Sequence, residues 1–505
     1  MIDNLLLGFQ VALSWDTLMF CFIGVSIGMF IGVLPGVGPL AAISLLLPLT
    51  YYIAATDALI MLAGIYYGAQ YGGSVASILL RLPGTASSAV VCMDGYEMTK
   101  NGRAGAALFL SAVASFVGGS IGILLMAGFA PALAAFALRF GSQEYFLLMA
   151  LGLIAASTLS EGSATRGLAM VVLGVLLGIV GLDTTSGTMR FVYGQFELMD
   201  GISLVASAMG LFGLSEILSN IGRSERTRPM HKVTLRSMIP TRTEMRDSWP
   251  AIWRGSAIGS FFGALPGTGS TIASFFSYAT EKKVARNRAR IGQGIVEGVA
   301  GPEAANNAAA QTAFIPTLTL GVPGDAVMAL LLGAMIVHGV NPGPQMLTNT
   351  PEMFWGLVAS FWLGNLILLV FNIPMIGLWV SMLRISYRLL YPAILVLVVI
   401  GTYSIRYSVF DIYQLLAFGF LGYILRLLDF PAAPLVLGLV LGPLMEENFR
   451  RSLMLSDGDF TTFLTRPISA VLFACIVLVL LAQVVAPLLR LWRGKTHDVR
   501  NDTHQ

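Results

Sequence analysis

The chain has 505 residues, of which 56% are hydrophobic and only 11% are charged, and its mean hydropathy is +0.78. A soluble domain carries about 25% charged residues, so this composition excludes an ordinary water-soluble protein. The net charge of +3 is too small and too dispersed to indicate a nucleic-acid-binding protein. Apolar stretches recur from Leu5 to Leu491, and each needs about 20 residues to cross a bilayer. We therefore expect an all-α polytopic membrane protein with about 11 to 14 membrane passages.

The N-terminal segment and the cysteines give no sign of processing or metal binding. Met1–Asn4 lacks the basic region of a cleavable signal peptide, so we expect the first hydrophobic stretch to be retained. Cys21, Cys92 and Cys475 lie far apart without a ligand spacing and are interpreted as small apolar packing residues. No cofactor is expected, and a coupling ion, Na⁺ or H⁺, is the one inorganic ligand that we predict.

Two Pro-Gly motifs in the first half of the chain return in the same order in the second half. The sequence GVLPGVG at Gly32–Gly38 is matched by GALPGTG at Gly263–Gly269, 231 residues later. The sequence SILLRLPGTA at Ser77–Ala86 is matched by TLTLGVPGDA at Thr317–Ala326, 240 residues later. Two independent matches predict that the chain consists of two related halves.

These matches and the distribution of charge divide the chain into four parts. We expect an N-terminal transmembrane repeat at 1–222 and a C-terminal transmembrane repeat at 249–490. Between them lies a basic linker at 223–248, and a polar tail at 491–505 follows. Because lysine and arginine mark the cytoplasmic side of membrane proteins, we place the linker and the tail in the cytoplasm.

Basic residues lie on both sides of the first Pro-Gly motif of the second half, at Arg223–Arg246 and at Lys282–Arg290. The stretch 249–279 therefore begins and ends in the cytoplasm, yet it is too short for two full spanning helices and a turn. We predict a re-entrant hairpin with Pro266–Gly269 at its tip within the membrane.

The equivalent motif of the first half has the opposite charge pattern. No lysine or arginine precedes Arg81, and the flanks carry Asp3, Asp16 and Asp57, so this hairpin should open to the periplasm. Two related halves of opposite orientation are the inverted-topology repeats of many secondary transporters. Alternatively, the glycines and prolines are kinks and close-packing positions in ordinary spanning helices. The matched positions of the breaks in both halves favour the re-entrant Pro-Gly hairpins.

The tips of such hairpins can bind ions, because irregular backbone at membrane depth requires a protein-lined or water-filled cavity. The helix after each break presents free N–H groups to anions, while the carbonyl groups of the preceding helix can coordinate a cation. The predicted substrate-binding residues of the tips are Gly36, Val37, Gly38, Thr85, Ser87, Gly267, Thr268, Gly269 and Ser270. The predicted coupling-ion residues are Pro35, Ser77, Pro266, Thr317, Gly324 and Asp325. The alternative for the hydroxyl groups is hydrogen bonding within and between packed helices.

The segment with the most polar residues between apolar stretches contains the adjacent residues Asn306 and Asn307. Their amides can donate to carboxylate oxygens and accept from a cation, so we add both to the substrate-binding set. Glu303 and Asp325 are candidates for a proton or sodium site, because intramembrane carboxylates are costly and usually functional. Glu303 follows Pro302, however, and the alternative is that it caps a helix start near the cytoplasmic surface.

Arg81 is the first basic residue of the chain and comes just before Leu82-Pro83-Gly84. A guanidinium group at this position could hold a substrate carboxylate through two parallel hydrogen bonds. It could equally extend to the membrane interface, as long basic side chains do. The sequence leaves both interpretations open.

At these motifs the chain resembles the large membrane subunit of the tripartite tricarboxylate transporters (TctA-like). The segments that carry the resemblance are Gly32–Pro39, Tyr71–Ser74, Leu82–Thr85, Gly263–Ser270, Pro302–Asn307, Pro323–Gly324 and Asn341–Pro344. They span most of the chain, and the run PEAANN is the most specific of them.

The resemblance implies a secondary transporter of the bacterial inner membrane, driven by an ion gradient and working by alternating access. Its implied partners are a small integral membrane subunit and a periplasmic solute-binding protein that delivers small carboxylates. Citrate, other di- or tricarboxylates and aromatic carboxylates remain open as the solute.

Two other classes compete with a carrier. A passive anion channel is one, since broken helices also form selectivity filters. An intramembrane enzyme is the other, but nucleophilic catalysis requires a base near an activated serine. His338 is the one histidine near an apolar segment, and no paired aspartate motif of an acid protease is present. The sequence therefore argues against an enzyme and leaves the channel as the main alternative.

Overall fold

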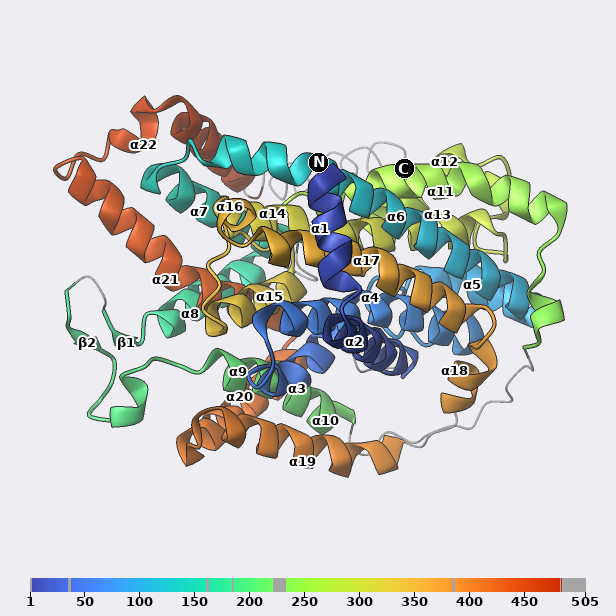
Figure 1. Cartoon of the computed structure of the whole chain (residues 1–505), viewed down its shortest axis with the longest axis horizontal. Helices are drawn as coiled ribbons and strands as arrows, with labels where there is room; N and C mark the ends of the chain where they lie inside the picture. Colours follow the sequence, from blue (N-terminus) through green and yellow to red (C-terminus); the bar gives the residue numbers. More distant parts are fainter. Residues whose placement is uncertain are drawn as a thin grey trace, which may run out of the picture.

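The computed structural model describes residues 2–34, 38–159, 163–183, 186–220, 233–383, 387–481 and 483, and it is almost entirely helical (Figure 1). Within these residues, one short antiparallel pair of strands occurs, β1 (Gly181–Leu182) and β2 (Met189–Arg190). Gly181 pairs with Arg190, and Leu182 pairs with Met189. The prediction of an all-α protein is confirmed for the described part of the chain.

The helices of the first half follow in close succession. They are α1 (Ile2–Ala12), α2 (Trp15–Val33), α3 (Pro39–Thr50), α4 (Ala55–Leu80), α5 (Val91–Lys100), α6 (Ala104–Ala137), α7 (Ser142–Leu159), α8 (Ala164–Gly178), η1 (Phe196–Leu198), α9 (Leu204–Ala208), the π-helical η2 (Met209–Leu214) and α10 (Ser215–Asn220).

The second half begins with a short 3₁₀ helix and contains both long and short helices. They are η3 (Leu235–Met238), α11 (Arg242–Gly263), α12 (Gly269–Val284), η4 (Arg288–Arg290), α13 (Glu297–Thr312), α14 (Phe314–Leu320), α15 (Ala326–Val337), α16 (Met346–Asn349), α17 (Pro351–Asn372), α18 (Ile376–Met382), α19 (Tyr387–Arg406), α20 (Val409–Leu427), α21 (Ala432–Leu455) and α22 (Thr462–Thr465). A further apolar helix covers Pro467–Leu481.

Four of the described helices are long and apolar enough to cross a bilayer, namely α2, α6, α17 and α20. Apolar helices of 10 to 17 residues, among them α3, α8 and α15, are interrupted before they reach that length. Glycine and proline lie at the ends of some of these helices, as Gly38 and Pro39 do at the start of α3 and Gly178 does at the end of α8. The helices are those of a membrane protein, while the number of 11 to 14 passages stays a prediction.

Glycine allows α2 and α4 to pack with their backbones in contact. A Cβ atom added to any of three glycines of α2 would lie under 3.0 Å from a carbonyl oxygen of α4, so these positions have no room for a side chain. Small residues at every fourth position are typical of tightly packed membrane helices. The glycines and the residues whose carbonyl oxygens they face are Gly24 with Met61, Gly28 with Ile65, and Gly32 with Ala69.

The second half repeats this contact between α11 and α13. Three glycines of α11 again leave no room for a Cβ atom beside carbonyl oxygens of the partner helix. Relative to the first half, the glycines are displaced by 231 residues and their partners by 240, as the Pro-Gly motifs are. The repeat therefore extends from the sequence motifs to the helix packing. The pairs are Gly255 with Gly301, Gly259 with Ala305, and Gly263 with Ala309.

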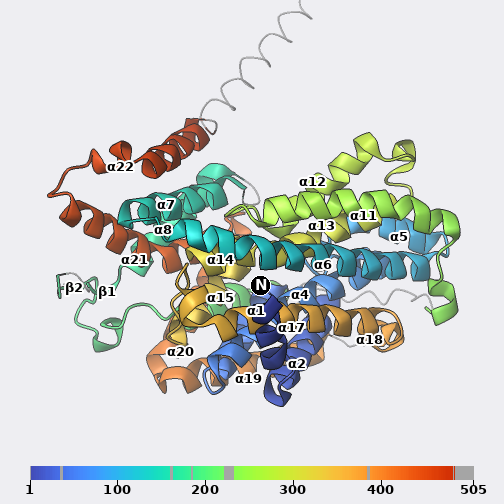
Figure 2. The ribbon, with the colours of Figure 1, turned by 45° about the horizontal axis from the view of Figure 1, so that its top comes forward.

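One end of the molecule, here called the basic end, gathers α5 and the starts of α6, α11 and α13 (Figure 2). Arg103 at the start of α6 bonds Glu244 in the first turn of α11. Asp94 of α5 accepts hydrogen bonds from the backbone of Gly292 and Gly294, just before α13. The second half therefore enters α11 and α13 from the end at which α5 finishes.

The termini of four other helices meet away from the basic end. The starts of α2 and α4 meet where Thr17 donates a hydrogen bond of 2.6 Å to Asp57. The ends of α3 and α15 meet where His338 lies 3.3 Å from the hydroxyl of Thr50. Consequently α4 runs toward the basic end, whereas α13, α14 and α15 lead away from it.

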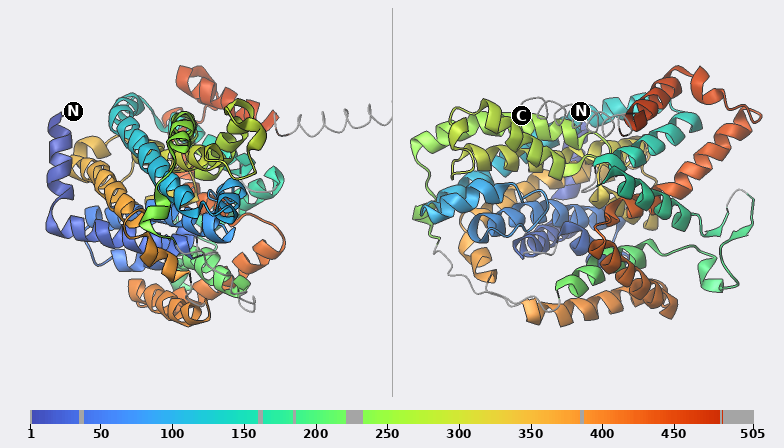
Figure 3. Two further views of the ribbon diagram at one scale, coloured as in Figure 1. Left: turned by 90° about the vertical axis from the view of Figure 1, so that its right-hand side faces the viewer. Right: turned by 180° about the vertical axis from the view of Figure 1, so that it is seen from behind.

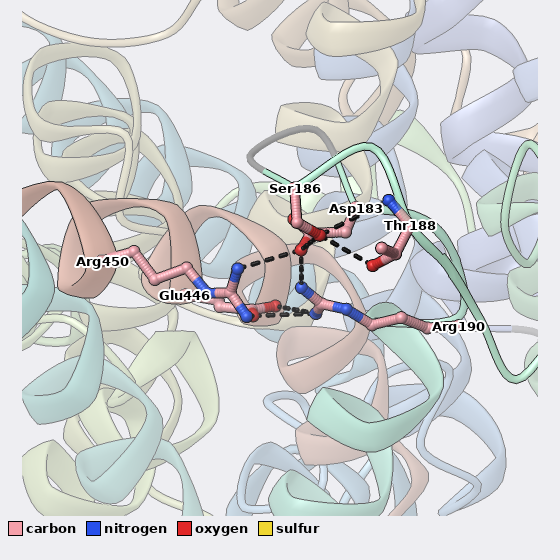
Figure 4. A network of polar contacts seen from close by, with 6 residues as sticks. All are labelled: Asp183, Ser186, Thr188, Arg190, Glu446 and Arg450. Carbon is pink, nitrogen blue, oxygen red and sulfur yellow. Dashed lines mark hydrogen bonds and ion pairs between the residues drawn. The ribbon is translucent and has the colours of Figure 1, made fainter.

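A network of four charged residues holds the β1–β2 hairpin on α21 (Figure 4). Arg190 bonds both Asp183 and Glu446, and Arg450 also bonds both carboxylates, at 2.9 Å each. The two positive and two negative groups balance each other, so the network leaves no charge to attract a solute. The hairpin that it fastens lies far from α5, as seen from behind in Figure 3.

Candidate functional site

The Pro-Gly segments of each half pack against each other. In the second half, the N–H of Gly267 donates a hydrogen bond of 2.8 Å to the carbonyl oxygen of Gly324. A Cβ atom on Gly324 would lie 3.4 Å from the carbonyl oxygen of Gly263. In the first half, a Cβ atom on Gly84 would overlap the carbonyl oxygen of Gly32. Each second motif therefore closes onto the end of the helix that leads into the first motif.

The helices before the second motifs also end in the same way. Arg81 after α4 and Gly321 after α14 are both left-handed, with φ of 57° and 67°. Arg81 is exposed, and its guanidinium lies 6.0 Å from the centre of the Tyr96 ring. The structure thus places Arg81 at the surface, which favours the interfacial interpretation over a role in binding the substrate.

Gln70 of α4 connects predicted residues from both halves. Its Nε2 donates to the hydroxyl of Ser270 at 3.2 Å, and its Oε1 accepts from the hydroxyl of Ser87 at 2.7 Å. The hydroxyl of Ser87 lies 3.0 Å from that of Thr85. All four side chains are buried. The tips at Thr85–Ser87 and at Ser270, about 180 residues apart in sequence, are therefore joined through one amide.

Tyr66, one turn before Gln70, makes a second connection between the halves. Its hydroxyl donates to Oδ2 of Asp325 at 2.8 Å, while Oδ1 accepts from the N–H of Met328 at 2.9 Å. A Cβ atom on Gly269 would lie 3.1 Å from that of Asp325. We name the group that these contacts assemble the central cluster: Tyr66, Gln70, Thr85, Ser87, Gly269, Ser270 and Asp325.

Asn306 is fully buried, and neither polar atom of its side chain has a hydrogen-bond partner among the described residues. Leaving a buried donor or acceptor unpaired costs about 1–3 kcal/mol, so native structures rarely do so without a reason. Asn306 occupies the position of the second half that corresponds, at the offset of 240, to Tyr66. Its free amide keeps it a candidate for binding a solute or an ion.

Asn307 belongs to a different group of side chains. Its Nδ2 donates to the hydroxyl of Ser115 on α6 at 2.8 Å, and Ser115 donates to Oε2 of Glu303 at 3.0 Å. Ser74 of α4 donates to Oε1 of Glu303 at 2.6 Å. These four residues, here the Glu303 cluster, show that the amide predicted to bind substrate is already paired in this state.

The alternative that Glu303 caps a helix is wrong. The helix α13 begins at Glu297, and Pro302 lies inside it rather than at its start. Glu303 is fully buried between α4 and α6. The carboxyl group therefore faces the protein interior.

Several predicted residues serve their own helices, as the helix-packing alternative proposes. Ser77 donates to the carbonyl of Gly73 and to Ser88, and Thr317 donates to the carbonyl of Ala313. The hydroxyl of Thr268 donates to the carbonyl oxygen of Leu265 at 3.0 Å.

The remaining predicted residues lie in the turns. Pro266 lies between α11 and α12, and Gly38 is the residue before α3, where a Cβ atom would meet nothing within 4 Å. Three predicted residues, Pro35, Gly36 and Val37, lie outside the described residues.

Sequence reasoning did not single out Tyr66 and Gln70. Both belong to the long helix α4, which consists mostly of apolar and small residues. Gln70 carries an amide in this setting, and Tyr66 stands 240 residues before Asn306. These two signals, an isolated amide and the repeat offset, were available in the sequence.

Comparison with known proteins adds an independent line of argument. The chain matches the model of the tripartite tricarboxylate transporter TctA family over residues 18–437. It is 48% identical over 488 residues to an "uncharacterized 52.8 kDa protein in TAR-I ttuC' 3'region" of Agrobacterium vitis, which covers 96% of this chain and 97% of that protein. It is 53% identical over 230 residues to an "uncharacterized protein in TAR-II ttuC' 3'region" of the same organism, covering 45% of this chain and 95% of that protein. No solved structure matches the chain. The resemblance read from the Pro-Gly motifs is confirmed, and the chain belongs to the TctA family of tripartite tricarboxylate transporters.

Proposed function

We propose that this chain is the transport subunit of a secondary transporter that imports small carboxylates across a bacterial inner membrane. Family membership supports the general function, and the central cluster supports the location of the site. In that cluster, hydroxyl groups from tips of both halves meet at Gln70. The unpartnered amide of Asn306, one helical turn from Glu303, is the observation that carries the proposal.

The chemistry of these groups suits an organic anion. Hydroxyl and amide N–H groups donate to carboxylate oxygens and can replace the water of a dissolved anion. The 16-residue helix α12 begins at Gly269, and its first N–H groups add the positive end of a helix dipole. We place the carboxylate between Asn306 and the tip at Gly267–Ser270, and a coupling cation beside Asp325.

The directions of the helices support inverted-topology repeats. The hairpin of α11 and α12 has its open end at the basic end, because Arg103 bonds Glu244 there and Arg254 bonds Glu281 between the two helices. The open side of α2 and α3 lies at the opposite end, with Asp57 and His338. With the basic end in the cytoplasm, the two re-entrant hairpins would open to opposite sides and permit alternating access.

The transporter would not act alone. We propose a periplasmic solute-binding protein and a small integral membrane subunit as its partners, and a gradient of Na⁺ or H⁺ as its energy source. These assignments rest on the family. The polar tail at 491–505 would lie in the cytoplasm.

The test is uptake of a panel of labelled di-, tri- and aromatic carboxylates into proteoliposomes that contain both membrane subunits. Binding protein is added outside, and the Na⁺ and pH gradients are varied separately. A carrier accumulates one panel member against its gradient and only with the binding protein present. Conductance that follows the solute gradient alone would instead establish the passive channel.

Replacing Asn306 tests the site itself. We expect Asn306→Ala to reduce uptake roughly tenfold, the effect of losing about 1.4 kcal/mol of binding. Stability should change little, because the amide has no partner to lose. Asn448→Ala is the matched control, since the side-chain amide of Asn448 donates to the carbonyl of Leu444 in its own helix. Normal uptake by Asn306→Ala would remove this residue from the site.

A further inference from the structure

The Glu303 cluster holds a buried carboxyl group that has no counter-ion among the described residues. Glu303 is fully buried, Ser74 and Ser115 are its hydrogen-bond donors, and among the described residues it takes part in no ion pair. An ionised carboxylate in such a setting costs several kcal/mol, because two neutral hydroxyl groups compensate its charge only in part. Protein interiors and membranes meet this cost by keeping the group neutral.

A count of the available hydrogen atoms shows that every hydrogen bond of the cluster can form when Glu303 carries one proton. Ser74 lies within hydrogen-bond distance of both Oε1 of Glu303 and the carbonyl oxygen of Gln70, yet its hydroxyl has one hydrogen. If Oε1 carries a proton, it donates to Ser74, and Ser74 donates to Gln70. On the other side, Asn307 donates to Ser115, which donates to Oε2. Every polar atom in this chain of bonds then has its role filled.

The hydroxyl groups also permit the reverse arrangement. Both Ser74 and Ser115 can turn their hydrogens toward an ionised Glu303, since a hydroxyl is donor and acceptor alike. The cluster can therefore accommodate the carboxyl group with and without its proton by rotation of the Ser74 hydroxyl, while Ser115 donates to Oε2 in both states.

Among the residues that the structure describes, no other charged group occupies the face of α13 that carries Glu303. With 3.6 residues per turn, Gly298 and Gly301 point about 140° and 200° away from Glu303. Asp94 of α5 lies against Gly298, and Glu281 of α12 lies against Gly301, where Arg254 of α11 pairs with it. The groups facing Glu303 are Ser74 and Tyr71 from α4 and Ser115 from α6; Glu297 lies at the start of α13, and α14 has no titratable side chain.

The cluster is coupled to the central cluster through α4. Ser74 bonds the main-chain carbonyl of Gln70, and the side chain of Gln70 holds Ser87 and Ser270. On α13, Glu303 and Asn307 flank Asn306. A change of protonation at Glu303 therefore acts on the two helices that carry the proposed solute site.

We infer that Glu303 binds the coupling proton of the transport cycle. The proton joins Oε1 when the site faces the side of high proton concentration, and it leaves to the other side after the solute site reorients. This assignment rests on the proposed transport function. It replaces Asp325 with Glu303 as the site of the coupling ion, outside the Pro-Gly tips.

Infrared spectroscopy of the full chain in lipid tests whether Glu303 carries a proton, and it needs no solute. The wild-type protein should show the carbonyl band of a protonated carboxylic acid at neutral pH, and alkaline titration should remove it. Glu303→Gln should lack this pH-dependent band. The matched control is Glu281→Gln, in which the lost carboxylate is ion-paired, and it should keep the band. A wild-type spectrum identical to that of Glu303→Gln would overturn the assignment.

Transport assays distinguish a loss of proton coupling from a loss of solute binding. Citrate is the first probe, followed by whichever panel member the wild type accumulates best. Glu303→Gln should exchange labelled for unlabelled solute across the membrane but should lose accumulation driven by a pH gradient. Accumulation equal to wild type under that gradient would overturn the inference. If the wild type transports no panel member, the proposed function fails, while the infrared result still decides whether Glu303 holds a proton.

Ser115→Ala covers the case in which Glu303→Gln does not fold. This variant keeps the carboxyl group and removes one of its two donors. The carbonyl band should remain, and the pH at which it disappears should change. An unchanged titration would contradict the role of Ser115 in the cluster and, with it, the assignment of the band to Glu303.

Discussion

Two carboxyl groups against α13, those of Asp94 and Glu303, are both fully buried but have different kinds of hydrogen-bond donor. Asp94 accepts from the backbone N–H groups of Gly292, Gly294 and Ile295 and from the hydroxyl of Tyr278, at 2.9–3.0 Å. Glu303 accepts from two serine hydroxyls. A backbone N–H can only donate, whereas a hydroxyl can also accept.

This difference gives the two carboxyl groups different roles: Asp94 is an anchor that holds two segments together, and Glu303 is a group that can exchange a proton. Three backbone donors hold the carboxyl oxygens of Asp94 in place, because a backbone N–H can only donate and cannot exchange roles with its partner. The same bonds tie α5 of the first half to the segment before α13 of the second half. The donors of Glu303 can reverse, so its environment suits a group that gains and loses a proton.

The largest expected effect comes from breaking the anchor. Asp94→Asn replaces an oxygen acceptor with an NH₂ group that faces donors, and we expect it to lower the free energy of unfolding by about 3 kcal/mol or more, since each buried group left unpaired costs about 1–3 kcal/mol. Thermal unfolding in detergent measures the change. Unfolding at the wild-type temperature would show that the cradle does not depend on the charge.

A smaller effect should follow from removing one donor of the anchor. Tyr278→Phe deletes the hydroxyl that bonds Oδ2 of Asp94 and leaves the three backbone donors in place. We expect a loss of about 1 kcal/mol, the usual net worth of one hydrogen bond, measured by the same unfolding assay. A loss as large as that of Asp94→Asn would mean that Tyr278, and not the backbone, carries the anchor.

The sequence allowed part of this arrangement to be predicted. The two offsets of 231 and 240 residues located the segments that pack together, because glycine at Gly32 and Gly263 is required by the same close approach in both halves. The family followed from these motifs as well. The role of Asp94 could not be predicted, since its donors are backbone groups about 200 residues away, which no side-chain pattern reveals.

The candidate site was predicted less completely for a similar reason. The tips at Thr85, Ser87 and Ser270 could be recognised, but their shared partner Gln70 lies on a helix whose facing surface depends on the tertiary packing. Asn306 and Asn307 were equivalent in sequence, and only the structure separates the free amide from the paired one. For Glu303, the preceding proline suggested a helix start, whereas the helix began six residues earlier.

A third carboxylate, that of Glu244, is partly exposed and should contribute less to stability than Asp94. Burial alone would raise the pKa of Glu244, but hydrogen bonds from Thr241 and Arg103 together lower it. Since the folded pKa lies below the unfolded one, Glu244 stabilises the fold above the unfolded value and loses this effect as the pH falls through the folded value. We expect Glu244→Gln to cost at most about 1 kcal/mol at neutral pH, because the ion pair is partly exposed. Comparing unfolding temperatures across pH checks this, and a difference that persists at acid pH would contradict it.

The smallest expected change in stability is also the one that most sharpens the contrast with Asp94. Glu303→Gln keeps the shape of a protonated glutamic acid: its oxygen accepts from Ser115, and its NH₂ group donates to Ser74. The hydrogen bonds to the two serines are kept and one N–H is added, so we expect the free energy of unfolding to fall by less than about 1 kcal/mol, well below the loss for Asp94→Asn. The measurement is thermal unfolding beside Asp94→Asn. A loss of unfolding free energy comparable to that of Asp94→Asn would show that Glu303 is ionised in the folded protein and is a second anchor. Only the removal of a negative charge that the fold depends on would have so large an effect.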